Sequence, residues 1–556
     1  MLPLLFAAAL AVQEGDERPR LDVDQLRAAT RLVGLDFSDA ELELMLGTVR
    51  RKVGGFRALR EGGIDNSVVP ALTFSPLLPG IELRVPEPPE PYPPRASVDV
   101  AHLADLAPDQ LAFEGIEALG TRIARREITC VELTEMYLER LERLDRELKC
   151  VVSFTRERAL AQARQLDAEL AEGKRRGPLH GIPWGAKDLF AVKGTRTTWG
   201  AKPYEEQEID LDATVVRRLD EAGAVLVAKL SLGALAMGDV WFGGTTKNPW
   251  DPRQGSSGSS AGSASAVAAG GVAFALGTET LGSIVSPAAR CGVSALRPTF
   301  GRVSRHGAMA LSWSMDKVGP ICRSADDVEI VLRAIAGPDG LDPSVHDVPL
   351  HPAHAYAVAG LRVGIPRGAF ERAEELAHVL EELEGLGVSL VEVDLPDFPT
   401  EAMMIVLDAE AATAFDELTR SDRDDLLVRQ DGGAWPNSFR SARLIPAVEY
   451  LRAQRLRTEL MLAMDRALAE VDALVHPNFA AGVLRITNLT GHPTAIVPCG
   501  RSDGGTPPTI SFTGQLFDEG RLLALVQAYQ AATDHERQRP ALDFLEAAPG
   551  EEGKDR

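Results

Sequence analysis

Hydrophobic residues along most of the chain alternate between helical spacing and short continuous runs. Helical spacing recurs in ITCVELTEMYLERLERL, residues 128–144, and in the alanine-rich ERALAQARQLDAELAEG, residues 157–173. Apolar runs of strand length lie at 225–230, 272–276, 362–366, 388–393, 473–477 and 494–498. This alternation is typical of an α/β domain, which we predict over residues 96–545, with a frayed tail over 546–556.

The first part of the chain has a different pattern. Two stretches, VDQLRAATRLVG and SDAELELMLGTVRRKV, carry apolar residues at helical spacing, and the second begins with Ser38-Asp39, which resembles a helix N-cap. After them comes VPEPPEPYPPR, in which six of the nine residues from Pro86 to Pro94 are proline. We therefore predict a small helical segment over 19–85 and an extended proline-rich linker over 86–95.

The amino terminus, MLPLLFAAALAVQEGDERPR, is apolar from Leu2 to Val12, and Ala9-Leu10-Ala11 resembles a signal-peptidase site. We expect a signal peptide over residues 1–18 and hence a periplasmic or secreted protein. Because no Lys or Arg precedes the apolar run, the alternative is a cytoplasmic protein whose apolar start packs on the domain. No other stretch reaches the roughly 18 to 20 apolar residues that span a bilayer, so we expect no membrane span.

Composition and charge narrow the range of partners. The chain has 556 residues, 45% hydrophobic and 25% charged, which are globular averages. Its formal net charge of −22 argues against nucleic acids and anionic membranes as partners, and favours a small uncharged substrate. The five cysteines are scattered without C-x-x-C spacing, so we expect buried thiols and neither a zinc site nor a disulfide framework. Oligomeric state is left open.

A stretch of small residues at 255–263, GSSGSSAGS, has the composition of a flexible linker. The residues that follow argue against that interpretation. They predict a closely packed helix over Ala264–Gly271, a buried strand over Val272–Leu276 and a second polar turn over Gly277–Ser283. A free linker has no reason to precede so ordered a segment, so we expect two polar turns joined by a helix and a strand.

These turns carry a family resemblance, together with two further motifs. The motifs are GSSGSSAGS, TETLGSI at 278–284, GIPWGAKDLF at 181–190 and NLTGHPTAIVP at 488–498. The chain resembles the amidase signature family of serine hydrolases from about Leu111 to about Pro540. The resemblance implies a mixed β-sheet core covered by helices and the hydrolysis of a linear amide C–N bond to an acid and ammonia or an amine. It implies neither a metal nor an organic cofactor.

The resemblance also assigns the reacting groups. The family's nucleophile falls on Ser283, its bridging serine, which follows a cis peptide bond, on Ser259, and its catalytic lysine on Lys187. Its oxyanion hole, made of backbone N–H groups, falls on Thr280, Leu281, Gly282 and Ser283. Weaker assignments to the substrate side fall on Met237, Gly238, Asp239 and Ser260.

Elementary chemistry agrees with this assignment. A serine hydroxyl is a poor nucleophile at neutral pH and needs an adjacent base. Lysine is a base only when its amine is neutral, so Lys187 requires a desolvated place that lowers its pKa, and its neighbours in GIPWGAKDLF are apolar enough to provide one. We expect the proton of Ser283 to pass through Ser259 to Lys187 and later to the leaving amine.

The chain departs from the family's pattern at four positions. Ser257 and Ala261 stand where the G-G-S-S-G-G-S motif has glycine, and Leu281 stands where glycine is commoner. Val285 replaces an arginine that many members have, which argues against recognition of an acidic group there. None of these changes removes a reacting group. Leu281 and Val285 favour an apolar acyl group.

Other assignments of the chemistry were weighed. Gly258 to Gly262 match G-x-S-x-G with Ser260 as nucleophile, but the preceding TKNPWDPRQGSS is turn-like, whereas that motif follows a strand. Ser314 and Lys317 match S-x-x-K without its companion motifs, and His492 is a lone histidine. Asp188 either orients the lysine region or starts a helix, and we expect Arg290 and Arg297 in structural ion pairs.

Two alternative functions remain open at the level of the sequence. One is the glutamine-hydrolysing subunit of a tRNA-dependent amidotransferase, which shares these motifs and works in a complex. The other is a catalytically inactive binding protein on the same fold. The presence of Ser283, Ser259 and Lys187 together counts against a purely binding role, since a binding module does not require all three.

Overall fold

The structure is a computed structural model that describes residues 21–60, 64–81, 83–88, 106–502 and 505–545. It divides into two compact units, Met1–Asp65 and Asn66–Arg556. The predicted signal peptide and tail, and most of the predicted linker, lie outside the described residues. Export therefore stays a prediction. None of the helices in the described residues is both long enough and apolar enough to cross a bilayer.

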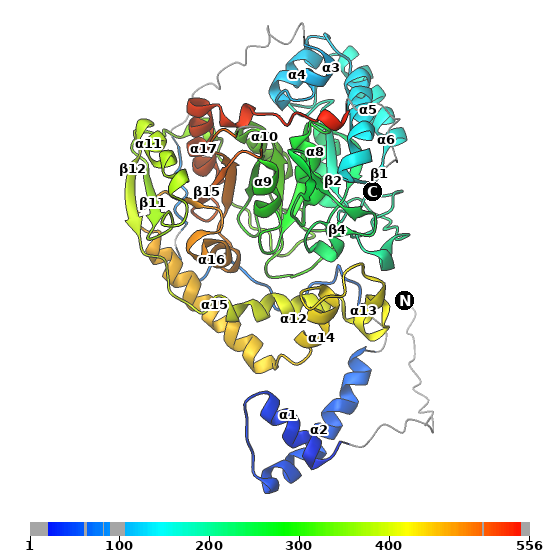
Figure 1. Ribbon diagram of the computed structural model, residues 1–556, viewed down its shortest axis with the longest axis vertical. Helices are drawn as coiled ribbons and strands as arrows, with labels where there is room; N and C mark the ends of the chain where they lie inside the picture. Colours follow the sequence, from blue (N-terminus) through cyan, green and yellow to red (C-terminus); the bar gives the residue numbers. More distant parts are fainter. Residues whose placement is uncertain (1–20, 61–63, 82, 89–105, 503–504, 546–556) are drawn as a thin grey trace, which may run out of the picture. The chain divides into compact units, whose positions relative to one another are not determined.

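The smaller unit contains two helices, α1 (Val23–Leu32) and α2 (Asp39–Arg60) (Figure 1). The Asp22 side chain caps α1 by accepting the Gln25 N–H at 2.8 Å. At α2 the Ser38 hydroxyl accepts the Glu41 N–H at 3.4 Å, and the Glu41 carboxylate accepts the Ser38 N–H at 2.8 Å. The predicted N-cap at Ser38 is confirmed, because this reciprocal pair satisfies backbone donors that the first helical turn leaves open.

In the described part of the larger unit, eleven strands form one mixed sheet in the order β1-β3-β2-β8-β10-β9-β14-β15-β13-β11-β12. They are β1 (Val151–Phe154), β2 (Pro183–Lys187), β3 (Val225–Leu230), β8 (Phe274–Glu279), β9 (Ser294–Arg297), β10 (Lys317–Cys322), β11 (Arg362–Pro366), β12 (Ser389–Val393), β13 (Ala473–Pro477), β14 (Thr494–Pro498) and β15 (Thr509–Gly514). Two short ribbons pair β4 (Val240–Trp241) with β5 (Gly244–Thr245), and β6 (Lys247–Asn248) with β7 (Asp251–Gly255).

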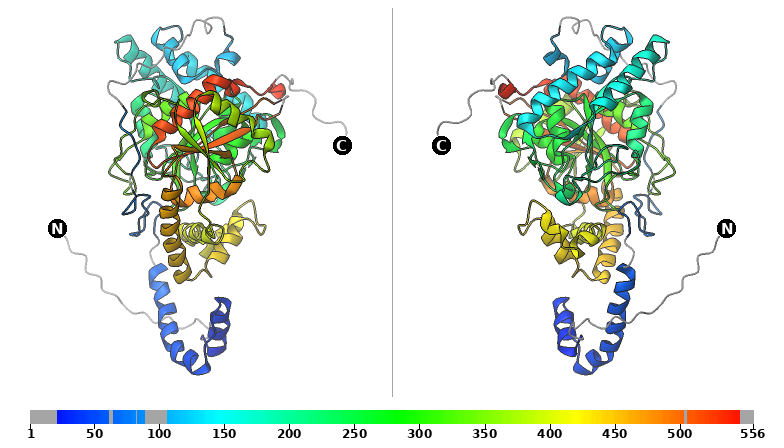
Figure 2. Two further views of the ribbon diagram at one scale, coloured as in Figure 1. Left: turned by 90° about the vertical axis from the view of Figure 1, so that its left-hand side faces the viewer. Right: turned by 90° about the vertical axis from the view of Figure 1, so that its right-hand side faces the viewer.

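Helices pack around the strands of this sheet (Figures 1 and 2). They are α3 (Pro108–Leu111), α4 (Ile116–Ala124), α5 (Cys130–Leu148), α6 (Arg156–Ala171), α7 (Thr214–Ala222), α8 (Ala261–Ala268), α9 (Val285–Cys291), α10 (Ala325–Ile335), α11 (His378–Gly385), α12 (Ile405–Ala414), α13 (Asp416–Arg420), α14 (Trp435–Ala442), α15 (Ala447–Ala467), α16 (Val483–Thr490) and α17 (Glu519–Thr533). The predicted α/β class, a mixed sheet covered by helices, is confirmed.

All six predicted strands exist, and one of them differs in its bounds. The run predicted to end at Leu276 begins at Phe274 and continues to Glu279 as β8. The prediction of a turn from Gly277 was wrong for its first three residues. The cause is a neighbour in space: β10 pairs with β8 in antiparallel register as far as Lys317↔Glu279, which extends the ladder into polar residues. The predicted turn-like segment before Ser257 also contains strands, β6 and β7.

The described residues between Asn66 and Pro88 belong to the larger unit and are extended, without helix or strand. We call residues 66–81 and 83–88 the strap. Its Phe74 ring meets Phe300 edge to face at 4.9 Å between centroids. The Arg84 guanidinium pairs with Asp465 at 2.6 Å. These contacts fix the strap to the larger unit at points far apart in the sequence.

All five cysteines are buried free thiols, as predicted. Burial raises the pKa of the Cys499 thiol to about 12, so this sulfur stays protonated and unreactive at neutral pH.

Helix α8 is buried at every one of its residues, and its small side chains let it pack closely. A Cβ at Gly262 would meet the Cys150 carbonyl oxygen and the Ser231 nitrogen, both backbone atoms. We predict that Gly262→Ala lowers the free energy of unfolding by about 1–3 kcal/mol through overpacking. The matched control is Gly385→Ala at the end of α11, where nothing lies within 4 Å of the new Cβ. Urea denaturation of both variants checks this, and an equal effect of the two would contradict it.

Candidate active site

Lys187 is the last residue of β2, and parallel strands flank it on both sides. The register pairs Ala186 with Leu276 of β8, so Lys187 lies beside the polar end of that strand. The lysine side chain is fully buried. Its ammonium group Nζ donates to the Thr278 hydroxyl at 2.9 Å and is 3.3 Å from the Thr278 carbonyl oxygen. The parallel pairing of β2 and β8 therefore brings these two chain positions together.

Two serines of the turn before α8 complete the surroundings of this lysine. Lys187 Nζ lies 2.8 Å from Ser259 Oγ and 3.1 Å from Ser260 Oγ. Both serines are buried, and the peptide bond between Gly258 and Ser259 is cis. A Cβ at Gly258 would clash with the Gly238 carbonyl oxygen, so only glycine permits this approach of the two backbones. The hydrogen-bond partners of the lysine are thus three hydroxyl groups and one carbonyl oxygen.

Ser283 lies against the same turn. The Ser260 N–H donates to the Ser283 carbonyl oxygen at 3.1 Å, and the Ser283 side chain is partly exposed. Gly282 before it has φ of 86°, a left-handed conformation that favours glycine. The structure therefore places Lys187, Ser259 and Ser283 in one neighbourhood, although they come from three separate segments.

The loop from Thr280 to Ser283 connects β8 to α9 and is held from both ends. The Thr280 hydroxyl donates to Asp316 at 2.6 Å. The Glu279 carboxylate accepts the N–H groups of Ile284 at 2.8 Å and Val285 at 3.0 Å. Because these bonds tie the loop to β8 and to the residue before β10, the backbone N–H groups of the loop have fixed directions.

Glu279 is itself paired inside the core. It accepts Arg297 Nη1 at 2.7 Å and Asn488 Nδ2 at 2.9 Å, and neither side chain of the ion pair is exposed. Burial raises the pKa of Glu279, but the Arg297 charge and the Val285 N–H outweigh it and lower the pKa to about 2. The carboxylate is therefore charged at neutral pH and keeps accepting the loop N–H groups.

Burial has the opposite effect on the lysine. It lowers the pKa of Lys187 to about 7, although the carboxylates of Asp316 and Glu279 raise it. Near neutral pH a large fraction of this amine is unprotonated, which is the state that accepts a proton. Hydroxyl neighbours permit this because they bind the neutral amine as well as the ammonium.

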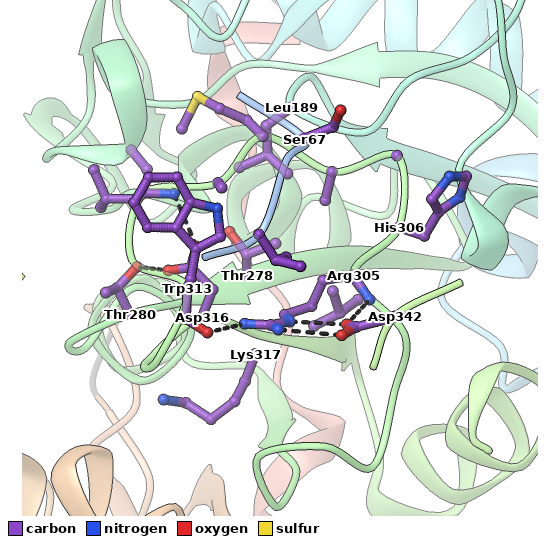
Figure 3. Close-up of a pocket in the computed structure, with 18 of the residues that line it drawn as sticks. Ser67, Leu189, Thr278, Thr280, Arg305, His306, Trp313, Asp316, Lys317 and Asp342 are labelled. Atoms are coloured by element: carbon purple, nitrogen blue, oxygen red, sulfur yellow. Dashed lines mark hydrogen bonds and ion pairs between the residues drawn. The ribbon is translucent and has the colours of Figure 1, made fainter. Parts of the chain in front are cut away.

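A pocket opens beside this group (Figure 3). Thr278 and Thr280 lie on its inner side, and Leu189, Met309 and Trp313 contribute apolar surface. The charged groups that line it are bonded to other groups of the protein, as the pairing of Arg305 Nε with Asp342 at 2.9 Å illustrates.

Comparison with known proteins identifies this arrangement. A family model described as Amidase matches residues 132–487.

The chain belongs to the amidase family.

Relatives and solved structures agree with the family. A glutamyl-tRNA(Gln) amidotransferase subunit of Methylococcus capsulatus is 36% identical over 476 residues, which are 76% of this chain and 98% of that protein. The peptide amidase of Stenotrophomonas maltophilia is 31% identical with a TM-score of 0.69, covering 77% of this chain and 98% of its own. An amidase family protein from Bacillus anthracis is 25% identical with a TM-score of 0.70, covering 80% and 95%. Family and neighbours together support an amide-hydrolysing enzyme.

The weaker assignments of the amidase pattern occupy the rim of the serine turn. Asp239 accepts the Ser257 N–H at 2.9 Å, and the Gly238 carbonyl lies against Gly258. Both therefore support the turn. Met237 lines a separate hollow with Leu427 and Trp435. Contact of these three residues with a substrate stays a prediction.

Ser260 has a second set of partners besides the lysine. Its hydroxyl donates to the Thr278 carbonyl oxygen and accepts the Thr278 N–H, both at 3.2 Å. A hydroxyl so fully bonded inside the core is unsuited to attack a substrate. The geometry therefore does not favour Ser260 as the nucleophile of a G-x-S-x-G elbow.

The remaining candidate residues lie in other bonding networks of this amidase fold. Asp188 starts no helix and pairs with Lys229 at 2.6 Å, both fully buried. Arg297 forms the expected ion pair, but Arg290 is exposed and bonds to the uncharged Gln254 at 2.8 Å, so an ion pair was the wrong expectation there. His492 bonds to the Thr490 hydroxyl at 2.8 Å, and burial lowers its pKa to about 3.

The S-x-x-K match is also accounted for by structure. The Ser314 hydroxyl donates to Glu410 at 2.8 Å, and the Lys317 ammonium contacts the Met315 carbonyl oxygen. Neither side chain contacts the other in these bonds, so the match does not form a catalytic pair.

Four residues that hold the site were missed by sequence reasoning. Thr278, Glu279, Asp316 and Asn488 lie in or beside recognised motifs, yet their roles depend on strand register and on contacts across the sheet. One signal was available: a glutamate inside the otherwise uncharged TETLGSI is expensive to bury and requires a partner.

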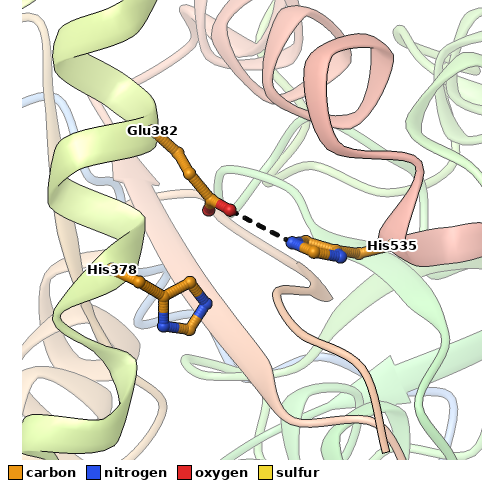
Figure 4. A group of neighbouring side chains, drawn as sticks. All are labelled: His378, Glu382 and His535. Atoms are coloured by element: carbon orange, nitrogen blue, oxygen red, sulfur yellow. Dashed lines mark hydrogen bonds and ion pairs between the residues drawn. The ribbon is translucent and has the colours of Figure 1, made fainter.

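One group of side chains has the composition of a metal site, away from the serine turn. His378, Glu382 and His535 place their ligand atoms within 4.8 Å of one another (Figure 4). Hydrogen bonds already account for these groups. His378 contacts the carbonyl oxygens of Glu375 at 2.9 Å and Cys499 at 2.5 Å, and Glu382 bonds to Tyr529 at 2.7 Å and to His535 at 3.2 Å.

The Glu279–Arg297 pair yields a stability prediction. Arg297→Met leaves a buried carboxylate without its cation, and we expect the free energy of unfolding to fall by about 3–5 kcal/mol. Adding Glu279→Gln removes the unpaired charge and should recover much of that loss. Urea denaturation measures both.

The control is Arg362→Met, which removes the exposed pair with Glu470. We expect that change to stay below about 1 kcal/mol. A loss for Arg297→Met no larger than for the control would contradict the importance of the buried pair.

Proposed function

We propose that this chain hydrolyses the C–N bond of a carboxylic amide through an acyl-enzyme on Ser283. The observation that carries the proposal is the buried Lys187 amine, 2.8 Å from Ser259 Oγ, with a pKa lowered to about 7. A neutral amine held against a serine relay is suited to accept a proton at physiological pH. Family membership supports the same class of reaction.

The acylation step uses the three groups in order. Ser283 Oγ attacks the amide carbon and loses its proton to Ser259, which passes its own proton to Lys187. The C–N bond then breaks, and the proton returns through the same groups to the leaving nitrogen, so that ammonia or an amine departs. The products of this step are a neutral amine and an ester on Ser283.

Deacylation repeats the sequence with water. A water molecule attacks the ester carbon and gives its proton to the relay, the bond from Ser283 Oγ to the acyl carbon breaks, and the hydroxyl recovers its proton. The acid is released. The proton balance of both steps closes on the three side chains and the water.

The developing negative charge on the substrate oxygen needs donors. We assign this role to the backbone N–H groups of the loop Thr280–Ser283, which Glu279 and Asp316 hold in place. Removing one such donor typically costs about 10² to 10³ in rate. Leu281 in this loop, where glycine is commoner, reduces the space beside the attacked carbon.

A second function is favoured by the curated relatives. Those at 36% and 34% identity are glutamyl-tRNA(Gln) amidotransferase subunits. If this chain acts in the same way, its substrate is glutamine and the ammonia is transferred within a complex. Ammonia release from glutamine that requires tRNA and a co-purifying partner would favour that function; hydrolysis of simple amides by the isolated chain would favour the first.

The nucleophile is testable by covalent labelling. We expect a fluorophosphonate probe to label the wild-type chain and to fail with Ser283→Ala, because the probe reacts only with an activated serine. Ser286→Ala, one helical turn further along, is the matched control and should keep its label. Intact-mass measurement reads the adduct directly.

Two results would overturn the assignment. Absence of a label on the wild-type chain would favour an inactive binding protein, and equal labelling of Ser283→Ala would place the nucleophile elsewhere.

The role of Lys187 predicts a pH profile. Because the amine accepts a proton only when neutral, the acylation rate should rise as pH increases through about 7 and level off above it. Lys187→Arg keeps a positive charge over that range, so we expect a loss of about 10² to 10⁴-fold and no rise near pH 7.

The exposed Lys193→Arg is the control and should leave the profile unchanged, since Lys193 pairs with Asp210 at the surface. Single-turnover rates from about pH 5 to about pH 9 measure all three proteins over the range in which a lysine of lowered pKa titrates. A wild-type rate independent of pH across this range would remove the lysine from the mechanism.

A further inference from the structure

The strap contributes to the pocket beside the serine turn. Ser67 and Val69 line it together with Leu189, Thr278 and Trp313. In Figure 3, Ser67 and Leu189 lie on the side away from Arg305 and Asp342. The pocket therefore has one wall made by a segment that precedes the family match, which begins at residue 132.

The wall is fixed by a specific pair of hydrogen bonds. The Asn66 side chain donates to the Ala310 carbonyl oxygen at 2.9 Å and accepts the Ala310 N–H at 2.7 Å. This amide satisfies both backbone groups of a residue that itself lines the pocket. Asn66 thus fixes the start of the strap, one residue before Ser67.

The opposite wall is also held by hydrogen bonds. Trp313 lies between Ser312 and Ser314, whose hydroxyls donate to Glu410 at 2.6 Å and 2.8 Å. Glu410 belongs to α12 and also accepts the Tyr450 hydroxyl at 2.9 Å. The indole is therefore a positioned apolar surface across the pocket from the strap.

The charged side chains that line the pocket are bonded within the protein. Arg305 is committed to Asp342, to Ser344 at 2.8 Å and to the Trp313 carbonyl oxygen at 2.6 Å. Asp316 accepts hydrogen bonds from the Thr280 hydroxyl and from two backbone N–H groups. Neither group is left to pair with a charge on a substrate.

Lys317 also lines the pocket, and it is buried. Its amine contacts the Met315 carbonyl oxygen, and burial together with the Arg297 charge holds its pKa well below the usual range of lysine. A charged substituent placed in this pocket would therefore lose its hydration without gaining a counter-ion. An apolar substituent would gain contact with Val69, Met309 and Trp313.

We propose that the strap is a specificity-determining wall of the active site, and that the pocket it closes selects amides with an uncharged, apolar substituent. The inference rests on the proposed amide hydrolysis and names the substrate class of that site. Asn66 acts as a positioning residue, since it fixes the wall without touching the reacting atoms.

The test compares amides that differ only in this substituent. We expect kcat/KM to be higher for hexanamide than for acetamide, and at least about 100-fold lower for 6-aminohexanamide and for the monoamide of adipic acid, whose charges the pocket cannot pair. Asn66→Ala should lower the ratio of hexanamide to acetamide by about tenfold, because the apolar contact loosens. A ratio of two substrates does not depend on how much of the enzyme is folded.

Asn437→Ala is the matched control. It removes a side-chain bond to the Gly432 carbonyl oxygen in another part of the chain, and the ratio should not change. An unchanged ratio in Asn66→Ala, or equal rates for charged and uncharged amides, would overturn the inference while amide hydrolysis stands.

Binding separates this inference from the chemistry. Calorimetric titration of hexanamide into Ser283→Ala should show binding that Asn66→Ala weakens by a similar factor. Such binding without hydrolysis by the wild-type chain would sink the proposed function and leave the pocket assignment intact. Absence of an effect of Asn66→Ala on binding would refute the pocket assignment.

Discussion

The site depends on one amine whose hydrogen-bond partners are uncharged. Lys187 is fully buried at the end of β2, and its partners are the hydroxyls of Ser259, Ser260 and Thr278 with one carbonyl oxygen. Burial without a counter-ion lowers the pKa of a lysine. The surrounding fold has to keep acids at a distance and yet hold three polar chain segments together, and most of the polar architecture serves those two demands.

Strand pairing meets the second demand. β2 runs parallel to β8, which carries Thr278, and β10 pairs with β8 from the other side. The serine turn then bonds to Thr278 and to Ser283 through Ser260. A site built in this way is rigid because each reacting group is attached to the central sheet or to a turn bonded to it. Acids nearby are committed elsewhere, Glu279 to Arg297 and Asp316 to the Thr280 loop.

Much of this was predictable from the sequence, for physical reasons. Apolar runs such as 473–477 and 494–498 became strands at the predicted bounds, because burial on both faces leaves a continuous apolar pattern. The motifs placed Lys187, Ser259 and Ser283, and the structure brings these positions together. The sequence did not predict that Gly277–Glu279 is strand or that Asp316 holds the loop, since both follow from contacts made across the sheet. The strap was beyond reach for the same reason, because nothing near Asn66 in the chain indicates Ala310 as its partner.

The pair of Asp188 and Lys229 has a consequence for its neighbour. Asp188 is the acid next to Lys187 in the chain, and Lys229 on the adjacent strand binds its carboxylate at 2.6 Å. The charges that raise the pKa of Lys187 accordingly come from Asp316 and Glu279 and do not include Asp188. Two buried lysines on neighbouring strands thus divide their tasks: one stays an ion and cancels the nearest acid, and the other is therefore free to be a base.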